Sequence, residues 1–116
     1  MADIKRFNVE KRLSDMAVYN GVAYLAGQIP EDGTLDIEGQ TRQVLQIIDR
    51  LLAEAGTDKS RILMAQIYIA NMAEFPGMNK AWDAWVAEGQ APVRCTVGAK
   101  LAHPDWKLEI RIVAAA

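Results

Sequence analysis

The spacing of apolar residues changes along this chain, from short alternating runs to helical stripes and back to alternating runs. Three strand-like runs come first, at residues 4–9, 17–20 and 22–28. The dipeptide Asn20-Gly21, between the second and third runs, is a strong signal for a tight hairpin turn. The pattern therefore predicts three strands at the start of the chain, two of them joined as a hairpin.

Two later stretches carry apolar residues three and four positions apart, which is the spacing of an amphipathic helix. The first stretch runs from about Glu38 to Ala55, and Gly56 follows where a C-terminal cap is expected. The second spans roughly Met78 to Glu88, and Gly89 is expected to end it.

Three further strands are predicted. Ile62 to Ala70 is rich in branched and aromatic residues, and Asp58 could cap a short helical turn before it. Val93 to Leu101 and Trp106 to Ala114 also alternate like strands, and residues 102–105 would join them as a hairpin loop.

The predicted order is β-β-β-α-β-α-β-β in one domain over residues 1–116, and we expect an α+β fold. Both helices are apolar on one side only, so they should cover one face of a mixed sheet. On the strand at 93–101 the set expected to face the helices is Val93, Cys95, Val97, Ala99 and Leu101, and the opposite set is Arg94, Thr96, Gly98 and Lys100. Because the second set is not uniformly charged, we expect other subunits and a ligand to cover that face.

The composition is typical of a globular protein with one core, with 116 residues, 51% hydrophobic and 24% charged. A net charge of −2 and the lack of a long basic run argue against binding through nucleic-acid phosphates. The single cysteine, Cys95, cannot form an internal disulfide. Without a signal segment or a run of roughly 20 apolar residues, a cytoplasmic protein with no membrane partner is the simplest interpretation.

Arg94 is the residue that most needs a partner, because it lies in the otherwise apolar stretch 91–97. Burial of an arginine is costly without one, and its planar guanidinium suits a bidentate grip on a carboxylate. That carboxylate could belong to Glu109, as a structural pair, or to a small acidic ligand. If residues 102–105 form the hairpin loop, Arg94 faces Val113 and lies roughly 13 Å from Glu109 along the strands. This register favours a ligand, another subunit or water as the partner.

Five other side chains have both a structural and a functional interpretation. Asn79, near the predicted start of the second helix, could cap it or contact a ligand. Trp82 and Trp85 are better explained by core packing than by ligand stacking, since their helix face is already apolar. Cys95 is expected as a small core residue because it belongs to the apolar set of its strand, and His103 as an exposed residue of a predicted loop. One histidine and one cysteine cannot build a typical zinc site unaided.

Several short motifs together resemble the Rid family, also called the YjgF family, of reactive-intermediate deaminases. The motifs are Gly27-Gln28-Ile29-Pro30, Met78-Asn79-Lys80-Ala81-Trp82, Pro92-Val93-Arg94 and Leu108-Glu109-Ile110. Each is weak alone, but the ordered set covers nearly the whole chain. Residues 78–86 and 91–97 are especially similar to the YoaB-like branch.

The resemblance implies a chorismate-mutase-like fold and a homotrimer, with sheets lining a central barrel and three sites in the clefts between subunits. In these sites Arg94 would grip the substrate carboxylate and Glu109 would position a water. The backbone of Gly27 would contact the ligand, and Asn79 would line the site. Thr96 replaces a cysteine of the best-known deaminase branch and could hold polar atoms of substrate or water.

Two further positions depart from that branch: Leu13 stands in place of a tyrosine and Ala26 in place of a serine. Imine chemistry therefore stays plausible, but the substrate preference cannot be carried over. We expect a hydrolase of the 2-iminobutanoate/2-iminopropanoate type, which converts 2-imino acids or enamines into 2-keto acids and ammonia without metal or organic cofactor.

The alternative is a non-catalytic module that binds a small 2-keto acid or related carboxylate and reports it to a partner protein. Some family members have been described as translation inhibitors or ribonucleases. The acidic balance of this chain and its lack of a basic aromatic platform argue against a nucleic-acid partner.

Overall fold

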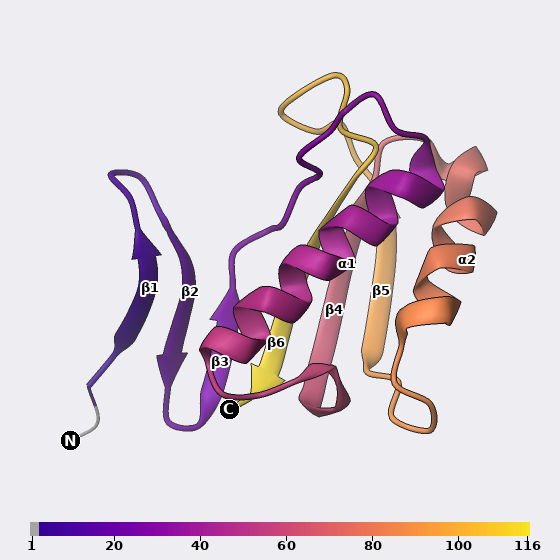
Figure 1. Cartoon of the computed structure of the whole chain (residues 1–116). Coiled ribbons are helices and arrows are strands. Elements are labelled where there is room, and N and C mark those ends of the chain that lie inside the picture. Colours follow the sequence, from indigo (N-terminus) through magenta and orange to yellow (C-terminus); the bar gives the residue numbers. More distant parts are fainter. Residues whose placement is uncertain (1–2) are drawn as a thin grey trace.

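Residues 3–116 are described by the computed structural model, and their six strands form one mixed sheet in the order β1-β2-β3-β6-β4-β5 (Figure 1). The strands are β1 (Lys5–Val9), β2 (Ser14–Tyr19), β3 (Val22–Leu25), β4 (Ile62–Ile69), β5 (Val93–Gly98) and β6 (Leu108–Ala115). The helices are α1 (Ile37–Glu54) and α2 (Phe75–Trp85), and the short 3-10 turns are η1 (Lys59–Arg61) and η2 (Met72–Glu74). The expected order of strands and helices is confirmed.

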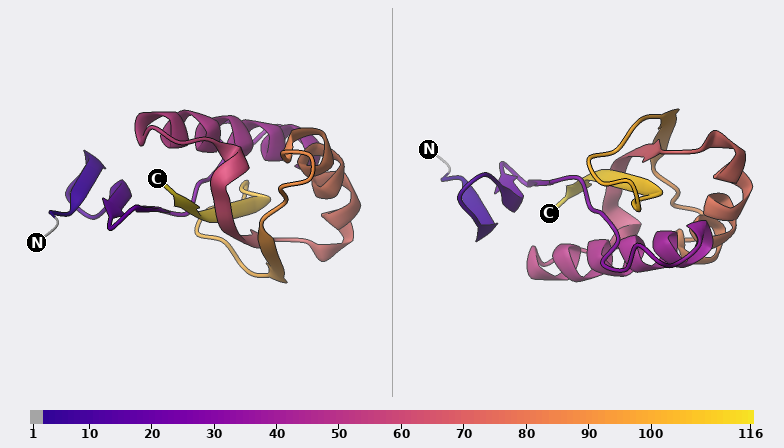
Figure 2. Two further views of the ribbon diagram at one scale, coloured as in Figure 1. Left: turned by 90° about the horizontal axis from the view of Figure 1, so that it is seen from below. Right: turned by 90° about the horizontal axis from the view of Figure 1, so that it is seen from above.

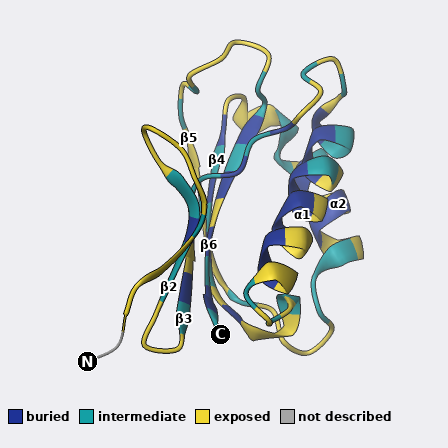
Figure 3. Ribbon diagram, turned by 60° about the vertical axis from the view of Figure 1, so that its left-hand side comes forward, coloured by how far each residue is buried: buried dark blue, intermediate teal, exposed yellow. Residues whose placement is uncertain are grey.

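Both helices lie on one face of the sheet, as predicted, and leave the other face open (Figure 2). The core fills the space between the two layers, and Figure 3 marks its buried positions on both the strands and the helices. Core residues on the strands include Met16, Ala23, Leu25, Ala65, Ile67, Ile69, Leu108, Ile110 and Ile112, and those on the helices include Val44, Leu45, Ile48, Leu51, Leu52, Met78 and Trp82.

Local signals found the elements in the first half of the chain, although β2 begins at Ser14 rather than Ala17 and β3 ends at Leu25 rather than Gln28. The Asn20-Gly21 turn joins β2 to β3, and both residues have positive φ, 50° and 74°, as the tightest hairpin turns require. Asp58 caps η1: hydrogen bonds from the side chain and then the backbone of Ser60 hold the pKa of Asp58 below its ordinary value. Gly56 follows α1 with a φ of 77°, as expected for a helix end.

The predicted hairpin of the last two strands is wrong. β6 lies between β3 and β4 and is antiparallel to both, whereas β5 runs parallel to β4 at the edge of the sheet. The inward residues of β6 are aliphatic and fully buried, which suits a central strand. The corresponding positions of β5 are Arg94, Thr96 and Gly98, which fit an edge position better.

The two faces of β5 are also the reverse of the prediction. Arg94 and Thr96 pair with Ala65 and Ile67, whose side chains are buried beneath the helices, so both face the helical layer. Cys95 lies on the open face and is exposed, so its expected core position is wrong. The prediction assigned the two faces of β5 from apolar character alone. It was wrong because the open face of this strand also carries apolar side chains, Val93 and Val97.

The second helix begins at Phe75 rather than Met78 and ends at Trp85 rather than Glu88. Pro76 in the first turn explains the early start, since proline lacks only a donor that would be unpaired there. At the other end Val86 already has an extended ψ of 140°. The shift places Asn79 inside the helix, so it is not the cap that one interpretation assumed.

Gln40, on the first turns of α1, connects three segments and is fully buried. Its amide nitrogen donates to the carbonyl oxygens of Asp105 at 2.9 Å and Leu35 at 3.1 Å. Its amide oxygen accepts from the backbone N–H of Lys107 at 2.8 Å. These bonds fix the long connection between β5 and β6 against the helix.

We expect Gln40→Ala to lower the free energy of unfolding by about 3 kcal/mol, because it leaves several buried backbone groups without partners. Chemical denaturation measures the loss. Gln46→Ala, at an exposed position of the same helix, is the matched control and should change stability by less than about 0.5 kcal/mol. Equal stability of the two variants would contradict this role of Gln40.

Candidate functional site

The guanidinium of Arg94 lies against α2. Its Nη1 donates to Oδ1 of Asn79 at 2.9 Å. Its central carbon lies 5.2 Å from the ring centre of Trp82 and 5.6 Å from that of Phe75, within the range of cation–π attraction. The side chain is thus held by one hydrogen bond and two aromatic rings.

The helical repeat produces this arrangement, because positions 75, 79 and 82 fall on one side of α2. Trp82 is buried and also packs against Trp85, with ring centres 5.4 Å apart, so the expected core role of Trp82 is confirmed. Its contact with Arg94, and that of Phe75, were missed by the sequence reasoning. The spacing of Phe75, Asn79 and Trp82, with proline after the first, is the signal that could have found them.

Arg94 has no acidic partner within the described residues, since no carboxylate oxygen of residues 3–116 lies within 4.0 Å of it. The direct pair with Glu109 is therefore absent. Thr96, on the same side of β5, has a buried hydroxyl with no hydrogen-bond partner in the described part of the chain. Arg94 is left able to bind an added carboxylate while its orientation is already fixed.

Glu109 lies on the open face of the sheet, on β6 opposite Tyr68 of β4. It lines a cavity of ≈ 360 Å³ together with Gly27, Tyr68, Ala99, Lys100, Leu101, Ala102 and Arg111. Gly27 follows β3, and the neighbouring Gln28 exchanges two backbone hydrogen bonds with Ile110, at 2.8 and 3.0 Å. This pairing brings the backbone of Gly27 against the Glu109 side chain.

The missing side chain of Gly27 makes room for the carboxylate. A Cβ atom at position 27 would lie 2.0 Å from Oε2 of Glu109 and 2.8 Å from its Cδ. The φ of Gly27 is not positive, so the backbone does not require glycine here. Glycine is needed because the carboxylate occupies the space that a Cβ would fill.

Within one chain, Arg94 and Glu109 cannot meet. Arg94 faces the helical layer and Glu109 faces the open side, with β4 between their strands. Two strand spacings and three residues of offset put their backbones about 14 Å apart. The sequence-predicted residues thus form two groups, Arg94 with Asn79 and Thr96 on one side of the sheet, and Glu109 with Gly27 on the other.

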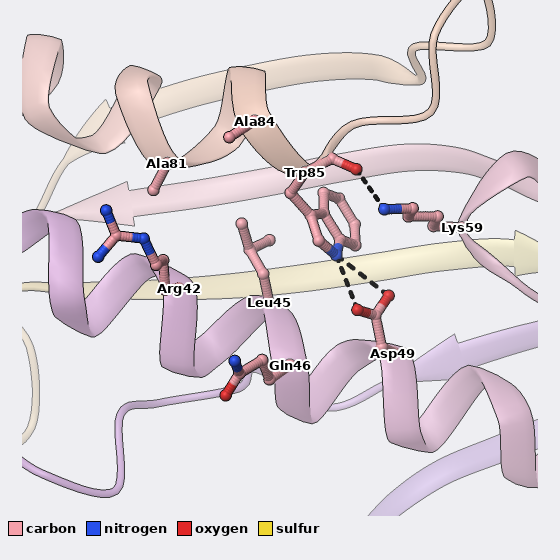
Figure 4. A pocket seen from close by; sticks show the side chains of 8 residues that line it. All are labelled: Arg42, Leu45, Gln46, Asp49, Lys59, Ala81, Ala84 and Trp85. Carbon is pink, nitrogen blue, oxygen red and sulfur yellow. Dashed lines mark hydrogen bonds between the residues drawn. The ribbon is translucent and has the colours of Figure 1, made fainter.

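A second hollow lies between α1 and α2 and contains none of the predicted site residues (Figure 4). Its charged groups and the Trp85 indole already have partners. The indole N–H of Trp85 donates to both carboxylate oxygens of Asp49 at 3.0 Å, and Lys59 donates to the carbonyl of Trp85. Arg42, at its rim, pairs with Glu38 at 2.8 Å. These contacts explain the groove as part of the helix packing.

The remaining residues singled out in the sequence, His103, Leu13 and Ala26, lie outside both groups. His103 lies in an exposed loop, where its Nδ1 accepts from the backbone of Asp105 at 3.1 Å and its ring packs near Trp106. Leu13 is half exposed before β2, and Ala26 follows β3. No three histidine, cysteine or acidic side chains of residues 3–116 cluster as potential metal ligands. Over the same residues, no helix has the length and apolar character needed to cross a bilayer.

These features define a small two-layer α+β protein with two charged groups of interest. Arg94 is held in a fixed orientation at the sheet edge, and the carboxylate of Glu109 lies beside Gly27 on the open face. A family model described as endoribonuclease L-PSP matches residues 3–116. A RutC family protein from Haemophilus ducreyi is 55% identical over 112 residues, which cover 97% of this chain and 96% of that protein. The RutC family protein YoaB from Escherichia coli is 48% identical, with 97% of each chain covered.

Solved structures agree. A member of the YjgF protein family from Neisseria meningitidis matches with a TM-score of 0.95 at 45% identity, over 97% of this chain and 94% of that one. The chain belongs to the Rid/YjgF family, for which L-PSP and RutC are other names. The resemblance found from the motifs is confirmed, including the likeness to YoaB.

For the binding of a 2-keto acid at Arg94 that the family resemblance implies, we expect Asn79→Ala to weaken the affinity for 2-oxobutanoate about fivefold, since the guanidinium loses the acceptor that orients it. Calorimetry measures the affinity, and thermal unfolding shows that the fold is retained. Asp83→Ala, an exposed truncation on the same helix, should bind like the parent. Unchanged affinity in Asn79→Ala would mean that this hydrogen bond does not prepare Arg94.

For the imine hydrolysis that the family resemblance implies, we expect Gly27→Ala to lower kcat/KM at least about tenfold, because the new methyl group displaces the Glu109 carboxylate. Stability should change little, since the displaced atoms are the end of a flexible side chain. Gly98→Ala is the control, because its Cβ would meet no atom closer than 3.8 Å. A fully active Gly27→Ala would show that the observed position of the carboxylate does not matter.

Proposed function

We propose that this protein hydrolyses 2-imino acids or their enamine tautomers to 2-keto acids and ammonia, at sites formed between copies of the chain. The observation that supports this most is the Arg94 guanidinium, oriented by Asn79 and two rings yet without a carboxylate partner among residues 3–116. A group prepared in this way suits a substrate with a planar carboxylate. Family membership supports the same reaction class.

We propose a homotrimer as the assembly. The open face of the sheet carries exposed apolar side chains, with Val93 at 69%, Tyr24 at 46% and Val97 at 39% of full exposure. A sheet face of this character is expected to be covered by protein. An assembly that covers it can also bring the Arg94 side of one copy to the Glu109 side of another, which one chain cannot do.

In the proposed reaction Arg94 holds the substrate carboxylate, and Glu109 accepts a proton from the attacking water. The water oxygen bonds to C2 while the C=N π pair moves to nitrogen, which takes the proton that Glu109 accepted. The hydroxyl proton of the resulting carbinolamine is then transferred to the amine nitrogen, the C–N bond breaks as the keto group forms, and ammonia leaves. Thr96 and the Gly27 backbone are available to hold polar atoms. The imine is already reactive, so positioning and proton transfer supply most of the required rate.

Co-assembly of two inactive variants tests both the residues and the shared site. Arg94→Ala and Glu109→Gln should each lose nearly all release of ammonia from freshly generated 2-iminopropanoate. Co-expressed from differently tagged copies, they should recover about one quarter of the parent activity, because in a randomly assembled cyclic trimer one site in four receives both intact residues.

Separately assembled variants, mixed without exchange of subunits, are the control and should stay inactive. If Arg94→Ala is as fast as the parent, the proposed roles are wrong. If both single variants are inactive and their co-assembly restores no activity, the site is not shared between copies. Tight binding of 2-keto acids by a parent that accelerates no imine hydrolysis would instead identify a binding module. The net charge of −2 gives no support to the ribonuclease activity that the family description names.

A further inference from the structure

The open face of the sheet carries very few charges. Its side chains on β3, β6, β4 and β5 are Val22, Tyr24, Met64, Gln66, Tyr68, Val93, Cys95, Val97, Glu109, Arg111, Val113 and Ala115. The two charged ones, Glu109 and Arg111, line the same cavity, and Lys100 lines it from the segment after β5. The charge that these four strands place on the open face, together with Lys100, therefore surrounds one cavity, whereas Arg6 of β1 and Asp15 of β2 lie farther out on the same face.

The two basic groups are not neutralised by the chain itself. Among residues 3–116, neither Arg111 nor Lys100 has a carboxylate oxygen within 4.0 Å, although Glu109 lines the same cavity. Two cations and one carboxylate leave this cavity with a net positive charge. Once a second copy covers the face, an arginine in this position needs an anionic partner, because desolvation of an unpaired charge is costly.

We infer that Arg111 and Lys100 select substrates with a second carboxylate on the side chain, so that the preferred substrates are 2-imino dicarboxylic acids. This inference rests on the proposed function. It adds that Arg94 holds the carboxylate at C1 while Arg111 and Lys100 hold the one on the side chain. The second carboxylate is unchanged by the hydrolysis.

The spacing supports this assignment. Arg111 and Glu109 are two residues apart on the same face of β6, roughly 7 Å between their backbones. The side-chain carboxylate of a four- or five-carbon imino acid lies two or three bonds beyond C2, the atom that the water must attack next to Glu109. Arginine and lysine side chains are long enough to cover the remaining distance. A short aliphatic imino acid would leave both cations without a partner.

A comparison of the kcat/KM values for two imines provides the test. The parent should have a higher kcat/KM for 2-iminosuccinate than for 2-iminopropanoate, each generated in situ by an amino-acid oxidase and followed by ammonia release. Arg111→Gln should lower the ratio of the two kcat/KM values about tenfold, and Arg111→Gln with Lys100→Gln should lower it further. High salt should also reduce the ratio, since it screens partly exposed charges.

Arg50→Gln is the matched control, because it removes an equal charge from an exposed position on α1, away from the cavity. It should leave the ratio unchanged. A parent that hydrolyses both imines equally well would overturn the inference and leave the proposed function standing. If Arg111→Gln instead weakens subunit assembly in sedimentation measurements and leaves the ratio intact, Arg111 pairs across the subunit interface and the inference is wrong.

A parent that hydrolyses neither imine would refute the proposed function, and binding then decides the inference separately. In calorimetry, 2-oxoglutarate should bind more tightly than 2-oxobutanoate to the parent, and the difference should shrink in Arg111→Gln. Equal affinity for the two acids would overturn the selection of a second carboxylate.

Discussion

The structure depends on the insertion of β6, the last strand of the chain, between β3 and β4. Its four inward residues, Leu108, Ile110, Ile112 and Ala114, are fully buried and join the β1–β3 half of the sheet to the β4–β5 half. Without this strand the two halves would share no ladder of hydrogen bonds. The same insertion leaves β5 at the edge, where Arg94 can lie against α2, and places Glu109 on the open face.

The two sides of the sheet hold their charged groups by different physical means. On the helical side, aromatic rings and an amide oxygen orient a guanidinium at the edge of the core, where an arginine can keep its charge accessible. On the open side, the Glu109 carboxylate occupies space that is free because Gly27 has no side chain. The first arrangement depends on what three side chains contribute, the second on what one residue lacks.

Local structure could be predicted from the sequence, and long-range pairing could not. The Asn20-Gly21 turn and the stripe of α1 depend on neighbours in the chain, so their signals are contained in short windows. The partner of β5 depends on which strand has the more apolar inward face, a comparison of distant segments. Assumed pairing of consecutive strands therefore gave a hairpin that does not exist.

In the candidate site, too, individual residues could be selected from the sequence but their spatial arrangement could not. Arg94 and Glu109 were selected correctly as groups without each other as partners, but the hairpin register that suggested this was wrong. The separation is real because they lie on opposite faces with β4 between them. The contact of Phe75 with Arg94 and the roles proposed for Lys100 and Arg111 went unnoticed, because they become apparent only when α2, β6 and the segment after β5 are placed in space.

The placement of Arg94 and Glu109 on opposite faces of the sheet also determines which copies of the chain contribute to each proposed site. If the copies close into a ring as proposed, every chain gives its arginine to one neighbour and its glutamate to the other. The number of sites then equals the number of chains, yet no site belongs to a single chain. The departure of one copy from a ring of three would open two sites at once and leave one intact.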